Sequence, residues 1–400
     1  MAYMPDVLSR GVSEILPSKD SLAKLMSTRK IRLYLGIDPT GSFLHLGHAV
    51  GLRKLQQFAK LGHQVILLVG NGTVKIGDPT GRDESRPVLD DATIEENFQH
   101  WKAQASKILD FSLIEVRYNG DWLDQLNYAD MVKLLAKTTV QQLLERDMFQ
   151  KRMQQGLPIH GHEIIYPLLQ GYDSVAMDVD LEIGGSDQTF NMLMGRQLQQ
   201  QYHQKEKWVM STPLIEGTDG RKMSKSFNNY VALTDPANDM YGKLMSIKDE
   251  LIIKYFEVLT DLEMTEIEAM SSAMQNGDNP MEFKKKLAFT ITKDLHNEQQ
   301  ALAAADFFTQ TVQNNEMPAE ELFESLIIQT VTKTDGQKLR TIAPHSKFSS
   351  AELNRRIEQG AVKLLPSLKK ITSRAEFLAL QDGSKLQLGK RDWYKIKIED

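Results

Sequence analysis

Two pairs of basic side chains have a spacing that suits phosphate chemistry. His45 and His48 stand one helical turn apart in HLGH, so both imidazoles point to the same side of a helix. Lys222 and Lys225 stand in the loop GRKMSKS, where two ammonium groups can grip a polyphosphate as charge develops on it. Each motif alone has an ordinary alternative, a pair of surface histidines or a solvated basic loop. Together in one chain, about 175 residues apart, they indicate a nucleotide site.

A third group of polar residues lies in EIIYPLLQGYD. Tyr166, Gln170 and Asp173 fall on one face of a helix, because they are separated by about one and two turns. Burying a carboxylate and an amide without partners is costly, and the apolar neighbours of these residues argue against a solvated face. The three side chains therefore predict a pocket rather than part of the core.

The elements that must position these residues alternate along the first half of the chain. Short apolar runs predict strands at residues 31–37, 64–70, 113–119, 179–185 and 207–215. Amphipathic patterns predict helices at residues 45–62, about 92–109 and 190–202. This alternation predicts an α/β domain with a parallel sheet covered by helices, and it places HLGH at a helix N-terminus, where anions bind. Residues 122–176 are strongly helical and predict an insertion into the sheet.

The rest of the chain differs in composition from this first half. Apolar residues recur at helical spacing after residue 236, so residues 229–330 predict an α-helical domain. Residues 331–400 hold 15 lysines and arginines against 8 acidic residues, a net charge of +7, whereas residues 1–330 have 33 against 45, or −12. The net charge of −5 over all 400 residues averages these two parts. The basic segment predicts a surface for RNA.

Several classes of protein are excluded by composition and motifs. The absence of cysteine rules out disulfides, thiolate zinc sites and thiol nucleophiles, and the histidine pair lacks a nearby third ligand. We therefore expect no protein-bound metal and no zinc. No G-x-x-x-x-G-K-[ST] motif occurs, and GNGTVK lacks the third glycine of a dinucleotide fingerprint. The chain has neither a signal-like start nor 18 consecutive apolar residues, which predicts a cytoplasmic protein without membrane contact.

HLGH and KMSKS on an alternating sheet resemble the signatures of the class I aminoacyl-tRNA synthetases. Tyr34 in YLGIDPT, Asp78 in GDPTGRDESR and the Y-x-x-x-Q-x-x-D face narrow the resemblance to the bacterial type of tyrosyl-tRNA synthetase. The resemblance implies a Rossmann-like catalytic domain at residues 1–228, a helical anticodon-side domain at 229–330 and an S-four-type RNA-binding domain at 331–400. It implies a ligase that joins tyrosine to ATP as tyrosyl-adenylate with release of pyrophosphate, and then transfers tyrosine to the 3′ end of tRNA(Tyr).

The same resemblance assigns roles to individual residues. His45, His48, Lys222 and Lys225 would be catalytic. The residues expected to bind tyrosine are Tyr34, Asp78, Tyr166, Gln170, Asp173 and Gln188, with Tyr34 and Asp173 on the phenol and Asp78, Tyr166 and Gln170 on the ammonium group. The residues expected to bind ATP are Gly36, Asp38, Thr40, Gly47, Gly185, Asp187, Met223, Ser224 and Lys225. The residues expected to bind RNA are Arg355, Arg356, Lys369 and Lys370.

The resemblance also implies partners. ATP would bind as a substrate with Mg²⁺, next to L-tyrosine, and tRNA(Tyr) would be the macromolecular substrate. Members of the family are dimers, and the insertion near residues 122–155 is where such relatives pair. This sequence departs from many relatives at Arg82, where they have lysine, and at Thr189 and Phe190, where others have Trp–Gly. Arg82 and Arg86 are candidates to steady the loop beside the substrate.

Three other functions share part of this pattern. A tryptophanyl-tRNA synthetase has the same signatures, but an indole N–H donates and cannot accept a hydrogen bond, so the Tyr34 and Asp173 pair suits a phenol better. A nucleotidyltransferase that makes a different adenylate needs neither the polar helix face nor a basic C-terminal segment. A non-catalytic RNA-binding protein would not need intact histidines and lysines in both signatures.

Overall fold

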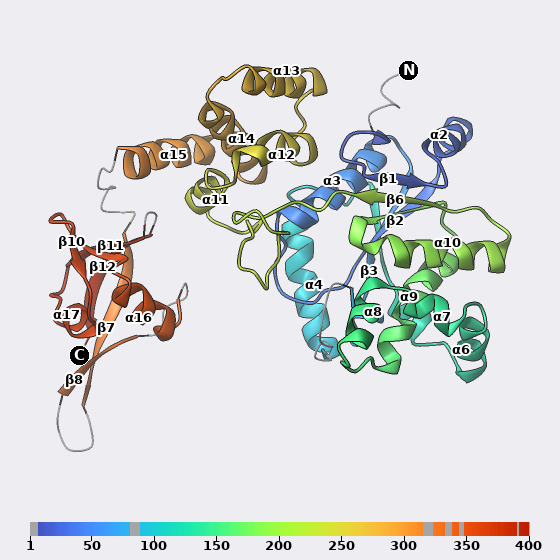
Figure 1. Ribbon diagram of the computed structural model, residues 1–400, viewed down its shortest axis with the longest axis horizontal. Helices are drawn as coiled ribbons and strands as arrows, with labels where there is room; N and C mark the ends of the chain where they lie inside the picture. Colours follow the sequence, from blue (N-terminus) through green and yellow to red (C-terminus); the bar gives the residue numbers. More distant parts are fainter. Residues whose placement is uncertain are drawn as a thin grey trace. The chain divides into compact units, whose positions relative to one another are not determined.

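The computed structural model describes residues 7–80, 89–314, 323–332, 338–343, 348–389 and 392–399. The chain divides into two compact units (Figure 1). The first consists of residues 1–235 and 243–295, and the second of residues 236–242 and 296–400. Each unit has its own six-stranded sheet.

The sheet of the first unit has the strand order β1-β6-β5-β2-β3-β4. Its strands are β1 (Glu14–Leu16), β2 (Arg32–Ile37), β3 (Gln64–Val69), β4 (Ile114–Tyr118), β5 (Leu181–Gly185) and β6 (Trp208–Thr212). Neighbouring strands are parallel, except that β1 pairs with β6 in the antiparallel direction. Strands β2, β3 and β5 are largely buried, as expected for apolar strands with helices on both faces.

Helices α3 (Leu46–Lys60) and α4 (Asp91–Ala105) lie on one side of this sheet, and α9 (Gly161–Ala176) and α10 (Thr189–His203) on the other (Figure 1). Because α3 follows β2 and α10 follows the neighbouring β5, the two connections leave the sheet in opposite directions. An open α/β sheet has its ligand crevice at such a point, outside the carboxyl ends of the strands. Helices α9 and α10 approach closely, since a Cβ on Gly171 would lie 3.0 Å from the backbone nitrogen of Gly195.

The remaining helices of the first unit surround this sheet or follow it. Between β4 and β5, in the predicted insertion, are α5 (Gly120–Leu123), α6 (Tyr128–Leu135), α7 (Val140–Leu144), α8 (Asp147–Gln154) and α9. The others are α2 (Lys19–Thr28), α12 (Ile252–Leu259), α13 (Met264–Gln275) and α14 (Pro280–Leu295). Arg10 donates at 2.6 Å to the carbonyls of Thr260 and Leu262, just after α12. These hydrogen bonds fix the N-terminal segment to the end of α12, within the first unit.

The second unit is a small α+β structure with the strand order β10-β9-β11-β12-β7-β8. Its strands are β7 (Glu324–Thr332), β8 (Lys338–Ile342), β9 (Val362–Leu365), β10 (Lys369–Ile371), β11 (Lys385–Leu388) and β12 (Asp392–Glu399). Its helices are α15 (Glu298–Phe308), α16 (Ser350–Glu358) and α17 (Arg374–Leu378), and α11 (Ala237–Leu244) lies where the chain passes between the units. Leu326, Ile357, Phe377 and Tyr394 belong to one buried core that joins this sheet to its helices.

The predicted α/β fold class with a parallel sheet is confirmed, and all five predicted strands of the first sheet are present. Strand β1 was not predicted, because three residues are too short for a periodic pattern. The two compact units do not follow the three predicted segments: α12 to α14 belong to the first unit, α15 belongs to the second, and β7 crosses residue 331. The division at residues 228 and 330 stays a prediction.

Among the residues that the structure describes, no helix combines the length and the apolar character needed to cross a membrane.

Candidate active site

A cavity of about 390 Å³ opens at the carboxyl ends of β2 and β5. It is bounded by the first turn of α3, the inner face of α9, the start of α10 and the KMSKS loop. Every residue predicted to be catalytic or to bind tyrosine or ATP lines this one cavity: Tyr34, Gly36, Asp38, Thr40, His45, Gly47, His48, Asp78, Tyr166, Gln170, Asp173, Gly185, Asp187, Gln188, Lys222, Met223, Ser224 and Lys225. Residues separated by almost 200 positions in the chain are therefore close together.

The two histidines of HLGH form the N-terminal cap of α3. His45 Nδ1 accepts from the backbone nitrogen of Gly47 at 3.1 Å, and His48 Nδ1 accepts from the backbone nitrogen of His45 at 3.1 Å. Burial lowers the pKa of His45 to about 2 and that of His48 to about 4, and nearby positive charge acts in the same direction. A neutral imidazole that accepts at Nδ1 carries its proton on Nε2. Each ring therefore offers one Nε2–H donor that the helix cap does not use.

We expect both imidazoles to stay neutral, with the proton on Nε2, from pH 8 down to about pH 5. Their folded-state pKa values lie below the ordinary histidine value of about 6.5, so unfolding takes up protons in acid, and the stability from these groups falls as pH drops from about 6.5 toward 4. Nitrogen spectra of histidine-labelled protein check the tautomer and the midpoint. A midpoint near 6.5 for His48, or a proton on Nδ1, would contradict this assignment.

The KMSKS loop is held against the same cavity. The Asn229 side chain accepts from the backbone nitrogen of Ser224 at 2.9 Å and donates to the carbonyls of Lys222, at 3.1 Å, and of Arg221. The Lys222 ammonium forms an ion pair with Asp187 at 2.6 Å. The loop thus has a defined shape, and its first lysine contacts a carboxylate of the β5–α10 junction.

The second lysine of the loop lies over aromatic rings. Lys225 Nζ is 4.2 Å from the centroid of the Phe43 ring and 5.8 Å from that of Trp101. Trp101 itself donates to the carbonyl of Gly41, in the segment between β2 and α3. Cation–π contacts of this kind help to hold the Lys225 ammonium group at the phosphate end of the cavity.

Asp173 lies at the inner end of the cavity and is almost fully buried, with 2% of its surface exposed. Its carboxylate accepts from Trp122 Nε1 at 2.9 Å and from Asn119 Nδ2 at 3.1 Å. Burial raises the pKa of Asp173 well above its ordinary value, although these two hydrogen bonds favour the charged form. The hydroxyl of Tyr34 is also buried and is 3.0 Å from Ser174 Oγ. Tyr34 and Asp173, the two residues predicted to bind the phenol, therefore both line the cavity, and hydrogen bonds to neighbouring side chains already hold them in place.

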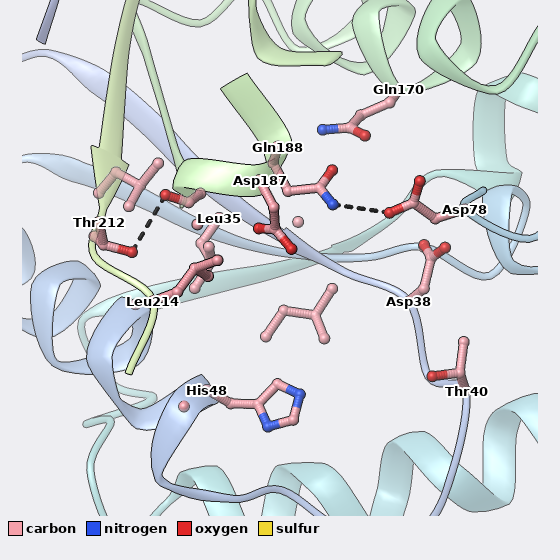
Figure 2. A pocket seen from close by; sticks show the side chains of 18 of the residues that line it. Leu35, Asp38, Thr40, His48, Asp78, Gln170, Asp187, Gln188, Thr212 and Leu214 are labelled. Atoms are coloured by element: carbon pink, nitrogen blue, oxygen red, sulfur yellow. Dashed lines mark hydrogen bonds between the residues drawn. The ribbon is translucent and has the colours of Figure 1, made fainter. Parts of the chain in front are cut away.

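A group of acids and amides surrounds the middle of the cavity (Figure 2). Gln188 Nε2 donates to Asp78 Oδ2 at 2.8 Å, and Tyr166 donates its hydroxyl proton to Asp38 Oδ2 at 2.8 Å. Figure 2 shows Asp38, Asp78 and Asp187 around the same space, with His48 facing them. A cationic group fits the acidic side of this space, and an anionic group fits the side of the histidines and lysines.

Several residues that support the site were not predicted. Asn119 and Trp122 follow β4, and their place after a parallel strand was a usable signal. Thr73 donates to Asp38 at 2.8 Å, and the buried Arg146 donates to Thr80 at 2.5 Å, next to Asp78. No sequence pattern predicts a role for Thr73 or Arg146, because each contributes only through a contact with a residue far away in the sequence.

Other predicted residues lie elsewhere. Arg82 and Arg86 lie outside the described residues. Arg355 and Arg356 lie on α16 and pair with Glu352 at 2.5 and 2.9 Å. Lys369 and Lys370 lie exposed on β10, in the same unit. Within the described ranges, no three histidine or acidic side chains form a group that could hold a metal ion.

The chain has relatives along its whole length. The family described as tRNA synthetases class I (W and Y) matches residues 26–313. The tyrosine–tRNA ligase of Thermotoga maritima is 42% identical over 98% of this chain and 96% of that protein. Tyrosine–tRNA ligase 2 of Photorhabdus laumondii is 42% identical over 96% of this chain and 94% of that protein.

Solved structures share the fold. A C-terminally truncated mitochondrial tyrosyl-tRNA synthetase of Coccidioides posadasii aligns with a TM-score of 0.61 at 23% identity, covering 76% of this chain and 91% of that one. The tyrosyl-tRNA synthetase of Archaeoglobus fulgidus, solved with L-tyrosine, aligns with a TM-score of 0.59 at 20% identity, covering 75% and 98%. With the family match and the full-length identities, the chain belongs to the class I tRNA synthetases, in the tyrosine–tRNA ligase family.

Proposed function

We propose that the cavity binds L-tyrosine and ATP together and activates tyrosine for transfer to tRNA(Tyr). In the first step a tyrosine carboxylate oxygen attacks the α-phosphorus of ATP, the bond to the β-phosphate oxygen breaks, and pyrophosphate leaves. In the second step the terminal ribose hydroxyl of the tRNA attacks the tyrosyl carbonyl, and AMP leaves. The observation that carries this proposal is that one cavity contains a buried acceptor for a phenol, an acidic middle and a basic phosphate end.

The tyrosine half of the proposal depends on burial and hydrogen-bond direction. Asp173 can accept a hydrogen bond from the phenol, because Asn119 and Trp122 each donate one hydrogen bond to its carboxylate and leave further lone pairs on the two oxygens. The same two bonds hold the carboxylate in place. Phenylalanine would leave this buried carboxylate without its partner, which disfavours phenylalanine. Asp78, Tyr166 and Gln170 would hold the ammonium group in the acidic middle of the cavity. Tyrosine bound in this way directs its carboxylate toward the histidines.

The ATP half depends on groups that stabilise negative charge. The Nε2–H donors of His45 and His48 would contact phosphate and ribose oxygens, and neutral donors can do so over a wide pH range. Lys222 and Lys225 would move onto the leaving pyrophosphate as charge develops there. ATP would bind as its magnesium complex, and Asp187 and Gly185 would contact its ribose. Catalysis would come from position and charge, without a covalent enzyme intermediate.

The test is ATP–pyrophosphate exchange with each amino acid in turn. We expect exchange with tyrosine and negligible exchange with phenylalanine or tryptophan. Exchange driven by tryptophan would favour the tryptophanyl alternative. Exchange with none of the amino acids would contradict both assignments.

We propose that the chain acts as a homodimer in the cytoplasm. Tyr128, Val132 and Leu135 recur on α6 at helical spacing and are 86%, 47% and 41% exposed, and Val140 at the start of α7 is 60% exposed. Such a group of exposed apolar side chains on one segment is typical of an interaction surface. A mass in solution near twice the 45.4 kDa of one chain is the expected result.

We propose that the second unit binds the tRNA backbone. Lys369 and Lys370 are exposed on β10, and Arg355 has a 64% exposed side chain on α16. Replacing both lysines by alanine should weaken tRNA binding and reduce the slope of log affinity against log salt by about two. Tyrosine-dependent exchange, which needs no tRNA, should stay unchanged. An unaltered salt slope in charging assays would contradict this role.

A further inference from the structure

A buried carboxylate, that of Glu182, is among the residues that line the cavity and has no role in the mechanism above. Glu182 on β5 is 2% exposed, and its backbone pairs in register with that of Tyr34 on β2. Its side chain contacts α9. Gln170 Nε2 donates to Glu182 Oε1 at 3.1 Å, and Ser174 Oγ, one helical turn later, is 3.5 Å from Oε2. The carboxylate is thus placed under the helix face that lines the cavity.

The charge of Glu182 is balanced by a lysine that is fully buried. Lys207 is 0% exposed, and its ammonium donates to Glu182 Oε2 and, at 3.1 Å, to the carbonyl of Met192. Space for this ammonium exists because residue 195 is glycine: a Cβ there would lie 2.5 Å from Lys207 Nζ and 2.8 Å from Ser174 Oγ. Removing a charge pair from water is costly, so a buried pair beside a ligand cavity calls for an explanation.

Glu182 is one end of a chain of amides that crosses the cavity. Gln170 Oε1 accepts from Asn191 Nδ2 at 2.9 Å, and the same Nδ2 donates to Gln188 Oε1 at 2.9 Å. Gln188 in turn donates to Asp78, as Figure 2 shows. An amide can point either way, whereas an ionised carboxylate only accepts. The carboxylates at the two ends therefore set the direction of the amides between them.

The hydrogen bonds of Asn191 indicate that its neighbours determine the orientation of the amide groups in this chain. Asn191 is 0% exposed, and its Oδ1 has no hydrogen-bond partner among the described residues, while its Nδ2 makes two bonds. Leaving a buried amide oxygen unpaired is unfavourable, so the neighbours of Asn191 must require its donor. The amide nitrogen of Gln170 faces Glu182, and its oxygen, which accepts one hydrogen bond from Asn191, keeps a second lone pair for a donor in the cavity.

We propose that Glu182, held by Lys207, is a positioning residue that fixes the Gln170 amide with its oxygen toward the tyrosine ammonium group. An ammonium group needs acceptors, and a reversed amide would present N–H donors to it. This inference rests on the proposed tyrosine site. It adds a determinant of tyrosine affinity that never needs to touch the substrate.

The proposal can be tested with two double variants that differ only in whether residue 182 can accept a hydrogen bond from Gln170. Glu182→Gln with Lys207→Met removes both charges but keeps an acceptor for Gln170. Glu182→Met with Lys207→Met removes the charges and the acceptor. We expect the first to keep the tyrosine KM within about threefold and the second to raise it about 10- to 100-fold, with the ATP KM unchanged in both. The reason is that only the second variant lets the Gln170 amide turn and lose its hydrogen bond to the charged ammonium group of tyrosine.

A ligand without the ammonium group gives a second readout. Binding of 3-(4-hydroxyphenyl)propionate should be the same in the two double variants, because Gln170 has nothing to accept from it. Equal tyrosine KM values in the two variants, an equal change in the ATP KM, or an equal loss with the deaminated ligand would overturn the proposal. The exchange assay with the wild-type protein separates the two proposals: no exchange with tyrosine overturns the tyrosine site itself, whereas exchange with equal tyrosine KM values in the two variants overturns only the positioning role.

The chain also offers a matched structural control. Arg152 and Glu163 form another buried pair at 2.7 Å, with side chains 2% and 1% exposed, and neither residue lines the cavity. Arg152→Met with Glu163→Gln should lower the unfolding temperature and leave the tyrosine KM unchanged. A rise in tyrosine KM equal to that of the Glu182→Met variant would mean that loss of any buried pair explains the effect, and would overturn the positioning role.

Discussion

Replacing Lys225 by alanine should slow formation of tyrosyl-adenylate about 100- to 1000-fold while leaving tyrosine affinity unchanged. The ammonium of Lys225 lies over Phe43 and Trp101 at the phosphate end of the cavity, whereas we assign the phenol to the buried Asp173 on α9. Its effect is expected in the transition state, where pyrophosphate gains charge. Rapid-mixing measurements with saturating tyrosine separate this rate from binding.

Lys248 is a suitable control for that experiment. It lies beside the KMSKS loop, since a Cβ on Gly220 would be 2.7 Å from its Nζ, but it does not line the cavity. Lys248→Ala should therefore leave the rate of adenylate formation within about twofold, as expected for loss of an exposed lysine. If Lys225→Ala weakens tyrosine binding as much as it slows the reaction, the assignment of Lys225 to pyrophosphate is wrong.

Replacing Asp173 by asparagine should reduce kcat/KM for tyrosine about 100-fold or more. The carboxylate accepts from Asn119 and Trp122, and an amide at this position would direct its own donor at one of them or at the phenol. Activity with phenylalanine should not fall in parallel, because phenylalanine has no phenol for Asp173 to bind. The preference for tyrosine over phenylalanine should therefore shrink.

Tyr34→Phe provides the comparison for this second prediction. It removes one neutral hydroxyl that bonds to Ser174, so the expected loss for tyrosine is about 10-fold or less. Measuring kcat/KM for tyrosine and phenylalanine with both variants checks the order of the two effects. Parallel losses for the two amino acids in Asp173→Asn would show that the change acts on folding or on the whole cavity rather than on the phenol.

The strands and helices that carry the site residues could be predicted from the sequence. The strands at residues 32–37 and 181–185 could be predicted, because a sheet covered on both faces needs apolar runs. His45 and His48 could be placed at a helix N-terminus, and the spacing of Tyr166, Gln170 and Asp173 placed them on one face. Connections on opposite sides of neighbouring strands then bring these residues to one crevice.

The contacts that tune the site could not be predicted, because they join residues with no fixed spacing. Lys207 reaches Glu182 only because α10 has glycine at residue 195, and Asp187 meets Lys222 only through the folded KMSKS loop. The helical residues after 236 gave a clear periodicity but no sign of which unit they join. That depends on tertiary contacts such as those of Arg10 with the carbonyls after α12.

The ion pair between Lys222 and Asp187 implies a competition for one carboxylate. Asp187 is the residue that we assign to the ribose, so an incoming nucleotide must take over the partner that the lysine now holds. The two side chains are 50% and 27% exposed, and a pair this open to water is worth no more than about 1 kcal/mol. The ion pair can therefore keep the KMSKS loop close to the cavity in the free protein. Because the pair is weak, breaking it costs little of the affinity for the nucleotide.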